Sequence, residues 1–334
     1  MTTIYRRSFQ SPAAIAFAIT LLATAAAPIE QDAKALKGSI RVDGSSTVYP
    51  ITEAVAEEFS KDAPRVSVTV GISGTGGGFK RFCAGETAIS AASRPISVSE
   101  VELAAKNSIE FIEVPVAYDA LSIVVHPTND WLKSITLAQL KAIYNAGGAK
   151  TWKDVDPSWP NRPIKIFSPG TDSGTFDYFK EAVLGKDGKV RSDISVSEDD
   201  NVLVLGVSGD PDAVGFFGLA YFDENKDKLR AVPVIDAKGA PVPPNAVTVN
   251  DGSYPLSRPL FIYVNAKAAT QPEVAAFVDF YLAHSRSLVS EVGYVELPEA
   301  IFAKSSANWK ARRLGTQFVK GGAKVEGAFS TIYQ

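Results

Sequence analysis

Three loops of this 334-residue chain share a composition that suits the binding of a small anion. They are residues 44–47 (Gly-Ser-Ser-Thr), 73–78 (Ser-Gly-Thr-Gly-Gly-Gly) and 170–175 (Gly-Thr-Asp-Ser-Gly-Thr). Glycine lets the backbone approach an anion closely, and serine and threonine hydroxyls supply neutral donors. Each loop precedes a predicted helix, whose first N–H groups are unpaired and lie at the positive end of the helix dipole. Three such helix ends facing one cleft would make an oxyanion site.

A tetrahedral oxyanion also favours a fixed cation, and Arg94 is the candidate. It follows Ser93 at the end of a short predicted strand, and Pro95 keeps its backbone extended; an ordinary surface arginine is the alternative. A carboxylate would select among anions, because hydrogen phosphate can donate a hydrogen bond to it and sulfate cannot. Asp172 is the best-placed carboxylate, and capping the helix from Ser173 is its alternative or additional role.

The elements that position these loops alternate between strand and helix. Strands are predicted at residues 39–42, 66–70, 89–93, 164–167 and 214–217, and helices from Pro50, Phe79, Ser97 and Thr175. Such alternation predicts an α/β fold with a largely parallel sheet and helices on both faces. The loops would then lie at the same ends of the strands, where α/β sheets bind ligands.

Two nearly continuous apolar runs, residues 120–125 and 260–264, are predicted to be strands that cross between two lobes. A further βα series lies between them. The first lobe would therefore be discontinuous, comprising residues 36–117 and 261–334, and the second lobe would comprise residues 118–260.

The N-terminus is typical of a secretory signal peptide. Arg6 and Arg7 precede an apolar run over residues 12–27, and residues 33–35 (Ala-Lys-Ala) form a cleavage site, with residues 23–25 as the alternative. We therefore expect residues 1–35 to be removed and the mature protein to be periplasmic. No cysteine lies near the cleavage region, so a lipid anchor is not expected.

Composition excludes several classes of function. The formal charge is −3, and it becomes about −4 without residues 1–35, which carry three basic and two acidic side chains. A nucleic-acid partner would need a basic face. Cys83 is the single cysteine, so neither a disulfide within the chain nor a cysteine metal site can form. We expect a monomer with neither metal nor cofactor.

Segments across the whole mature chain resemble the PstS family of phosphate-binding proteins, in its SphX-like branch. They are residues 40–50 (IRVDGSSTVYP), 73–79 (SGTGGGF), 92–96 (ASRPI), 169–176 (PGTDSGTF), 197–201, 214–218 and 254–260. The resemblance implies the two-lobed fold of type II periplasmic binding proteins. It also implies inorganic phosphate as ligand and the membrane permease of a phosphate ABC importer as partner.

The resemblance carries over site residues from each loop. Thr47 and the Val48 N–H, beside Ser46, would hold phosphate oxygens from the first loop. Thr75 would do so from the second loop, near Ser93. From the third loop the phosphate ligands would be Ser173, Gly174 and Thr175.

One departure concerns the charged residues of the site. The best-known branch has an aspartate where this chain has Arg94, and an arginine where it has Pro169. Arg94 would then replace that arginine from another loop, and Asp172 would accept the phosphate proton. Asp119 and Asp200 are reserve candidates for that acceptor.

Three other functions remain open on the sequence. Receptors for sulfate, molybdate or tungstate use similar backbone donors, and an adhesion or signalling role on the same fold is also compatible. Residues 171–175 superficially resemble the serine segment of a trypsin-like protease. That reading needs a histidine base, and the only two histidines, His126 and His284, both occupy positions that suit structural roles.

Overall fold

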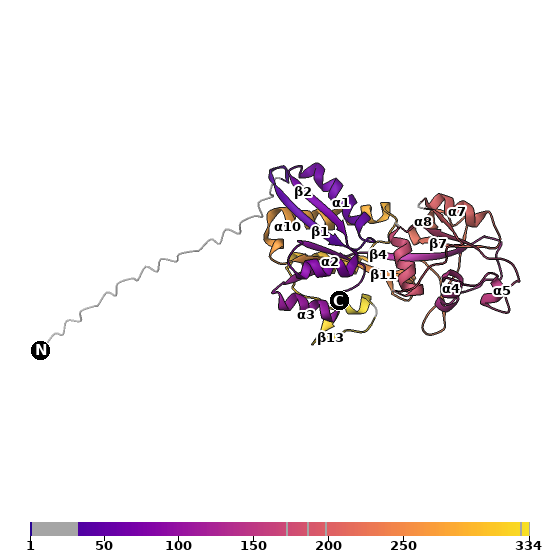
Figure 1. Ribbon diagram of the computed structural model, residues 1–334. Coiled ribbons are helices and arrows are strands. Elements are labelled where there is room, and N and C mark those ends of the chain that lie inside the picture. The colour runs from indigo at the N-terminus through magenta and orange to yellow at the C-terminus, as the bar shows by residue number, and fades with distance from the viewer. Residues whose placement is uncertain (2–32, 172, 186, 198, 328, 334) are drawn as a thin grey trace. The chain divides into compact units, whose positions relative to one another are not determined.

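The computed structural model describes residue 1 and residues 33–171, 173–185, 187–197, 199–327 and 329–333 (Figure 1). Most of the predicted signal peptide therefore lies outside the described residues, as does Asp172. Residues 33–334 form one compact unit, which begins with a 3-10 turn at Ala33–Ala35. Among the described helices, none combines the length and apolar character needed to cross a membrane.

Strands and helices alternate as predicted through the first part of this unit. The strands are β1 (Gly38–Gly44), β2 (Val66–Ile72), β3 (Ile89–Ala92) and β4 (Phe111–Val125), and the helices are α1 (Tyr49–Asp62), α2 (Gly74–Cys83) and α3 (Val98–Lys106). The spacing of Ser97 and Glu100 in the sequence predicts a capping box, and the two residues form one at the start of α3.

The middle of the chain continues the same alternation in shorter elements. They are α4 (Leu137–Tyr144), α5 (Trp152–Val155), β5 (Lys165–Pro169), α6 (Gly174–Phe179) with a π-helical continuation (Lys180–Leu184), β6 (Ser195–Ser197), α7 (Asp200–Ser208), β7 (Ala213–Gly218), α8 (Leu219–Glu224), β8 (Arg230–Ala231), β9 (Val234–Ile235), β10 (Pro241–Val242) and α9 (Ala246–Asn250). The last part comprises β11 (Ser257–Asn265), a 3-10 turn (Ala268–Thr270), α10 (Pro272–Glu291), α11 (Glu299–Lys310), β12 (Val319–Lys320), β13 (Ala323–Lys324) and α12 (Phe329–Ile332).

The main sheet has the order β2-β1-β3-β11-β4-β7-β5-β6, with β8 also paired to β4. β1 is parallel to β2 and β3, and β5 is parallel to β6 and β7. β11 is antiparallel to both of its neighbours, and so is β4. The sheet thus consists of two parallel groups separated by the antiparallel pair β4 and β11. This is the α/β architecture of type II periplasmic binding proteins.

Alternating side chains of β4 and β11 face two separate helical layers. Ile262 and Val264 pack with α1 and α10, where Phe59 and Phe277 meet edge to face. Tyr263 faces the other way, against Phe79 of α2. Because both faces of these strands are covered by helices, their sequences read as continuous apolar runs.

The two predicted crossing strands belong to neighbouring strands, β4 and β11, but residues 120–125 and 260–264 do not pair with each other. β11 pairs with the first part of β4, from Phe111 to Ala120, and β7 pairs with the rest, from Leu121 to Val125. β4 continues without interruption through residues 117 and 118, where the division between the lobes was predicted. The lobe boundaries themselves stay a prediction.

A buried carboxylate lies on the α2-facing side of this strand pair. Glu113 of β4 stands opposite Tyr263 of β11 and accepts hydrogen bonds from the Tyr263 hydroxyl (2.9 Å), the Thr316 hydroxyl (2.5 Å) and the Gln317 N–H (3.2 Å). Burial raises the pKa of Glu113 from 4.5 to about 7, although these donors act in the opposite direction.

This shifted pKa predicts a pH-dependent stability. Unfolded chains release the Glu113 proton near pH 4.5 and folded chains near pH 7, so the folded state holds more protons between these values. The free energy of unfolding should therefore fall by roughly 1 kcal/mol per pH unit from pH 5 to pH 7, and then level off. Urea unfolding at pH 5, 6, 7 and 8 should show this decline relative to Glu113→Gln. Parallel pH profiles for the two proteins would contradict it.

Candidate functional site

Loops from both parallel groups of strands meet at one cavity of about 460 Å³. The residues that line it are Ser45, Ser46, Thr47, Gly74, Thr75, Gly76, Ser93, Arg94, Asp177, Lys180, Glu181, Gly185 and Arg258. Five of the predicted site residues are among them: Ser46, Thr47, Thr75, Ser93 and Arg94.

Two glycines allow the first two loops to approach each other. Gly44 has φ +145°, and a Cβ there would collide with the carbonyl oxygen of Ala91. A Cβ on Gly78 of α2 would lie 2.5 Å from the Gly44 Cα atom. Larger residues would therefore separate α2 from the end of β1 and widen the cavity.

The helices that follow the loops differ in how their first turns are satisfied. α1 and α2 begin without a side-chain cap, whereas Ser173 caps α6 by accepting from the N–H groups of Thr175 and Phe176. No described side chain thus occupies the first turns of α1 and α2, although in α1 the Tyr49 N–H donates to the Ser45 carbonyl oxygen at 3.1 Å and Pro50 has no N–H. Ser173 already has a structural role.

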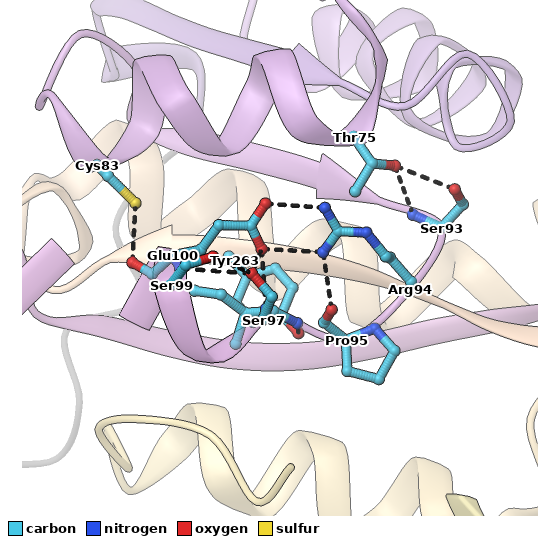
Figure 2. Close-up of polar contacts among 10 residues, drawn as sticks. Thr75, Cys83, Ser93, Arg94, Pro95, Ser97, Ser99, Glu100 and Tyr263 are labelled. Atoms are coloured by element: carbon cyan, nitrogen blue, oxygen red, sulfur yellow. Dashed lines mark hydrogen bonds and ion pairs between the residues drawn. The ribbon is translucent and has the colours of Figure 1, made fainter. Parts of the chain in front are cut away.

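Hydroxyl groups of the second loop and of β3 form a connected pair. Thr75 Oγ1 lies 3.0 Å from Ser93 Oγ and accepts from the Ser93 N–H at 3.1 Å (Figure 2). This contact holds the Thr75 side chain against the residue that precedes Arg94. Both hydroxyls border the cavity, where each keeps further hydrogen-bonding capacity.

Arg94 borders the same cavity, but its guanidinium is bound to Glu100. Nη1 and Nη2 donate to the two carboxylate oxygens at 2.9 and 2.8 Å, and Nη1 also donates to the Pro95 carbonyl (Figure 2). Although burial acts against it, the pKa of Glu100 is lowered by the bonds from Arg94 and Ser97. The side chain of Arg94 is 41% exposed. The positive charge that Arg94 brings to the cavity is thus already paired with the carboxylate of Glu100.

A second arginine at the cavity escaped the sequence-based reasoning. Arg258 lies at the start of β11, and its Nη2 donates to Thr47 Oγ1 at 2.8 Å. Its Nε donates to Asp119 Oδ2 at 3.2 Å. Burial raises the pKa of Asp119, and the charge of Arg258 counteracts that shift. Asp119, a reserve candidate for the proton acceptor, is therefore already engaged by Arg258.

Contacts also join the first and third loops across the cavity. Thr47 Oγ1 donates to the Gly174 carbonyl at 3.5 Å, and Ser46 Oγ donates to Asp177 Oδ2 at 3.0 Å. The Thr47 side chain is buried, with only 2% of the residue exposed. Thr47 is thus the point where the first loop, the third loop and Arg258 meet.

The remaining predicted residues border this region without lining the cavity. Val48 is fully buried at the start of α1, and Gly174 contacts Thr47. Within the described chain, Ser173 and Thr175 are not among the lining residues, although they lie at the start of α6 beside Gly174. Asp172 lies outside the described residues.

The histidines that a serine hydrolase would need have other neighbours. His126 Nδ1 bonds to Thr128, and the His284 ring stacks on Phe280 with centroids 3.9 Å apart. Ser173 Oγ is used as the helix cap. In the described parts of the chain, no cluster of three or more His, Cys, Asp or Glu side chains is placed to hold a metal ion.

This fold, with helix-start loops from two α/β lobes at one cavity, is that of a periplasmic binding protein of type II. Comparison with known families agrees, because a family model described as a PBP superfamily domain matches residues 29–285.

Three relatives define the family more closely. Protein SphX of Synechococcus elongatus is 47% identical over 324 residues, covering 96% of this chain and 95% of that protein. The phosphate-binding protein PstS of Staphylococcus haemolyticus is 42% identical, covering 80% and 84%. A crystal structure described as a possible phosphate binding protein from Planctomyces limnophilus is 43% identical, with a TM-score of 0.81 over 83% of this chain and 99% of that one. The chain belongs to the PstS family, in the branch that includes SphX.

Proposed function

We propose that this protein binds one inorganic phosphate ion in the cavity between its lobes and delivers it to the membrane permease of an ABC importer. The observation that carries the proposal is the meeting of three hydroxyls, from Thr47, Thr75 and Ser93, with the uncapped starts of α1 and α2 and with Arg258. Neutral hydroxyl and N–H donors suit an oxyanion. The names of the Staphylococcus and Planctomyces relatives support phosphate as that oxyanion.

We assign phosphate contacts to residues of all three loops. The first loop provides Ser46, Thr47 and the Val48 N–H. The second loop provides Thr75, together with Ser93 at the end of β3. The third loop provides Gly174 with the Thr175 N–H or hydroxyl. Ser173 supports the third loop as the cap of α6, and because its oxygen only accepts in that cap, its hydroxyl hydrogen can also donate to phosphate. Asp172 remains the proposed acceptor of the phosphate proton.

Binding is proposed to proceed by closure of the lobes, with no covalent step. Phosphate would first meet the loops of one lobe, and the other lobe would then rotate about β4 and β11 to complete the shell of donors. The contacts between the first and third loops, Thr47 to Gly174 and Ser46 to Asp177, belong to the closed arrangement. Phosphate stabilises that arrangement because only there can it bond to both lobes.

The proposal places the mature protein, from residue 36, in the periplasm. Delivery requires a folded receptor that reaches the permease from outside the membrane, and the predicted signal peptide supports export. The binding step uses only donors and charges of this chain.

Calorimetric titration of the mature protein tests this function. The protein is unfolded and refolded to remove bound ion and then titrated separately with phosphate and sulfate. We expect one phosphate per chain with micromolar or tighter affinity, and sulfate binding at least about 100-fold weaker, because the carboxylate that accepts the phosphate proton would repel a fully ionised anion. Tighter binding of sulfate, or of neither ion, would contradict the phosphate assignment and favour another oxyanion.

A further inference from the structure

Three contacts fix the guanidinium plane of Arg258. Nε donates to Asp119 Oδ2, the Arg258 Cζ lies 3.8 Å from the centroid of the Tyr178 ring, and Nη2 donates to Thr47 Oγ1. The side chain of Arg258 is only 12% exposed, and that of Asp119 only 3%. A guanidinium held at Nε and across one face keeps its terminal nitrogens in a set direction, and here these border the cavity.

The outer nitrogen of this group is only loosely engaged. Nη1 lies 3.5 Å from Glu181 Oε2, and the Glu181 side chain is 65% exposed. A solvated carboxylate at this distance contributes little to holding the guanidinium. An incoming anion can therefore displace Glu181 and bind across Nη1 and Nη2, the geometry in which arginine recognises oxyanions with two parallel hydrogen bonds.

Arg94, which lines the same cavity, offers a different arrangement. Both of its terminal nitrogens are already taken by the two oxygens of Glu100, which is itself held by Ser97 (Figure 2). An anion that bound Arg94 in the same way would have to break this bidentate pair and leave a half-buried carboxylate without its partner. The cost of freeing the guanidinium is thus higher for Arg94 than for Arg258.

The position of Arg258 also relates the site to the strands between the lobes. Arg258 and Asp119 are direct partners in the pairing of β11 with β4. The guanidinium simultaneously contacts Thr47 from the first lobe and Tyr178 from α6. An anion bound to Arg258 would therefore be linked to both lobes and to β4 and β11, the hinge strands about which the lobes are proposed to rotate.

From this geometry we propose that Arg258 is the cation that binds phosphate, and that Asp119 is the residue that positions it. The proposal rests on the proposed function and names the charged group of that site. Arg94 then serves to anchor, through Glu100, the segment whose Ser93 holds Thr75 of the second loop, rather than to neutralise the ligand. When the lobes close, phosphate bound to Arg258 connects both lobes to the hinge strands β4 and β11.

Titration with inorganic phosphate of Arg258→Gln, Arg258→Lys and Arg94→Gln tests the assignment. We expect a loss of affinity of about 100-fold or more for Arg258→Gln, because a charge-assisted bidentate contact disappears. Arg258→Lys should lose more than tenfold, since an ammonium has no planar fork to rest on Tyr178. Arg94→Gln should lose less than tenfold. An equal or larger loss for Arg94→Gln would overturn the proposal.

The positioning role of Asp119 has its own test. Asp119→Asn should weaken phosphate binding, but adding it to Arg258→Gln should cause no further loss, because the residue acts through the arginine. A merely structural effect would instead add to the first loss, and that result would remove Asp119 from the proposal.

Two exposed carboxylates, those of Glu181 and Asp177, provide a test that leaves the buried pair of Arg258 and Asp119 unchanged. Glu181 contacts Arg258, whereas Asp177 also lines the cavity but bonds to Ser46. At low salt, Glu181→Gln should tighten phosphate binding about threefold, and more than Asp177→Asn, which removes the same charge. Equal effects would show that phosphate does not use the Arg258 edge. Titration of the wild-type protein distinguishes failure of the proposed function from failure of the Arg258 assignment. If the wild-type protein does not bind phosphate, the proposed function is wrong. If Arg258→Gln binds phosphate as tightly as the wild type does, only the assignment of Arg258 is wrong.

Discussion

Replacing Thr47 with valine is expected to weaken phosphate binding about 100-fold. Valine keeps the shape of threonine but lacks the hydroxyl, and a hydrogen bond to a charged ligand contributes about 1.5–3 kcal/mol. Thr47 Oγ1 also accepts from Arg258 Nη2, so the substitution leaves a partly buried guanidinium nitrogen without this partner. The calorimetric phosphate titration measures the combined effect on affinity.

The same change at Thr52 provides the control. Thr52 lies one turn further along α1, is fully buried, and pairs its hydroxyl with that of Tyr281 at 3.2 Å. Thr52→Val should lower the melting temperature modestly without altering phosphate affinity, because it removes a buried hydrogen bond of a residue that does not line the cavity. If Thr47→Val bound phosphate as tightly as Thr52→Val does, the first loop would not be a phosphate ligand.

Gly174→Ala is expected to weaken phosphate binding by about 10- to 100-fold through a purely steric effect. A Cβ at this position would lie 2.8 Å from the Thr47 Cα atom, and both atoms belong to backbone that cannot rotate away. The third loop would have to move away from the first, and overpacking of this kind costs about 1–3 kcal/mol. That cost arises when the loops meet, so it should reduce affinity more than it reduces the stability of the unliganded protein.

A glycine in the core of the same lobe allows the two effects to be separated. A Cβ on Gly215 of β7 would lie 2.9 Å from the Val207 side chain, away from the cavity. Gly215→Ala should therefore lower the melting temperature and leave phosphate affinity unchanged. Measuring both quantities for both variants is decisive, and unchanged affinity in Gly174→Ala would mean that the loops do not need to meet.

Features that depend on a few neighbouring residues could be predicted from the sequence. The capping box at Ser97 and Glu100, and the loops that begin α1 and α2, follow from local backbone and hydrogen-bonding preferences. The two apolar runs predicted to be crossing strands are likewise present, because strands covered on both faces carry a continuous apolar pattern.

The charged partners in the site could not be predicted in this way. Glu100 was expected only as a capping residue, yet it also binds Arg94. Arg258 and Thr47 are 211 positions apart, and Arg258 reaches Asp119 through the register between two strands. In the sequence analysis, Arg258 appeared only within residues 254–260, one of the segments that resemble the PstS family. Its place in the site depends on which strand lies next to β4, and that is decided by tertiary packing.

The position of β11 in the sheet has a consequence for how the chain matures. β11 begins at residue 257, yet it lies between β3 and β4, which end by residue 125. A chain that has emerged only as far as residue 250 lacks the strand that joins them and exposes two unpaired sheet edges. Completion of the main sheet must therefore wait for the last quarter of the polypeptide, so that the first lobe reaches its final stability only when nearly the whole chain is available.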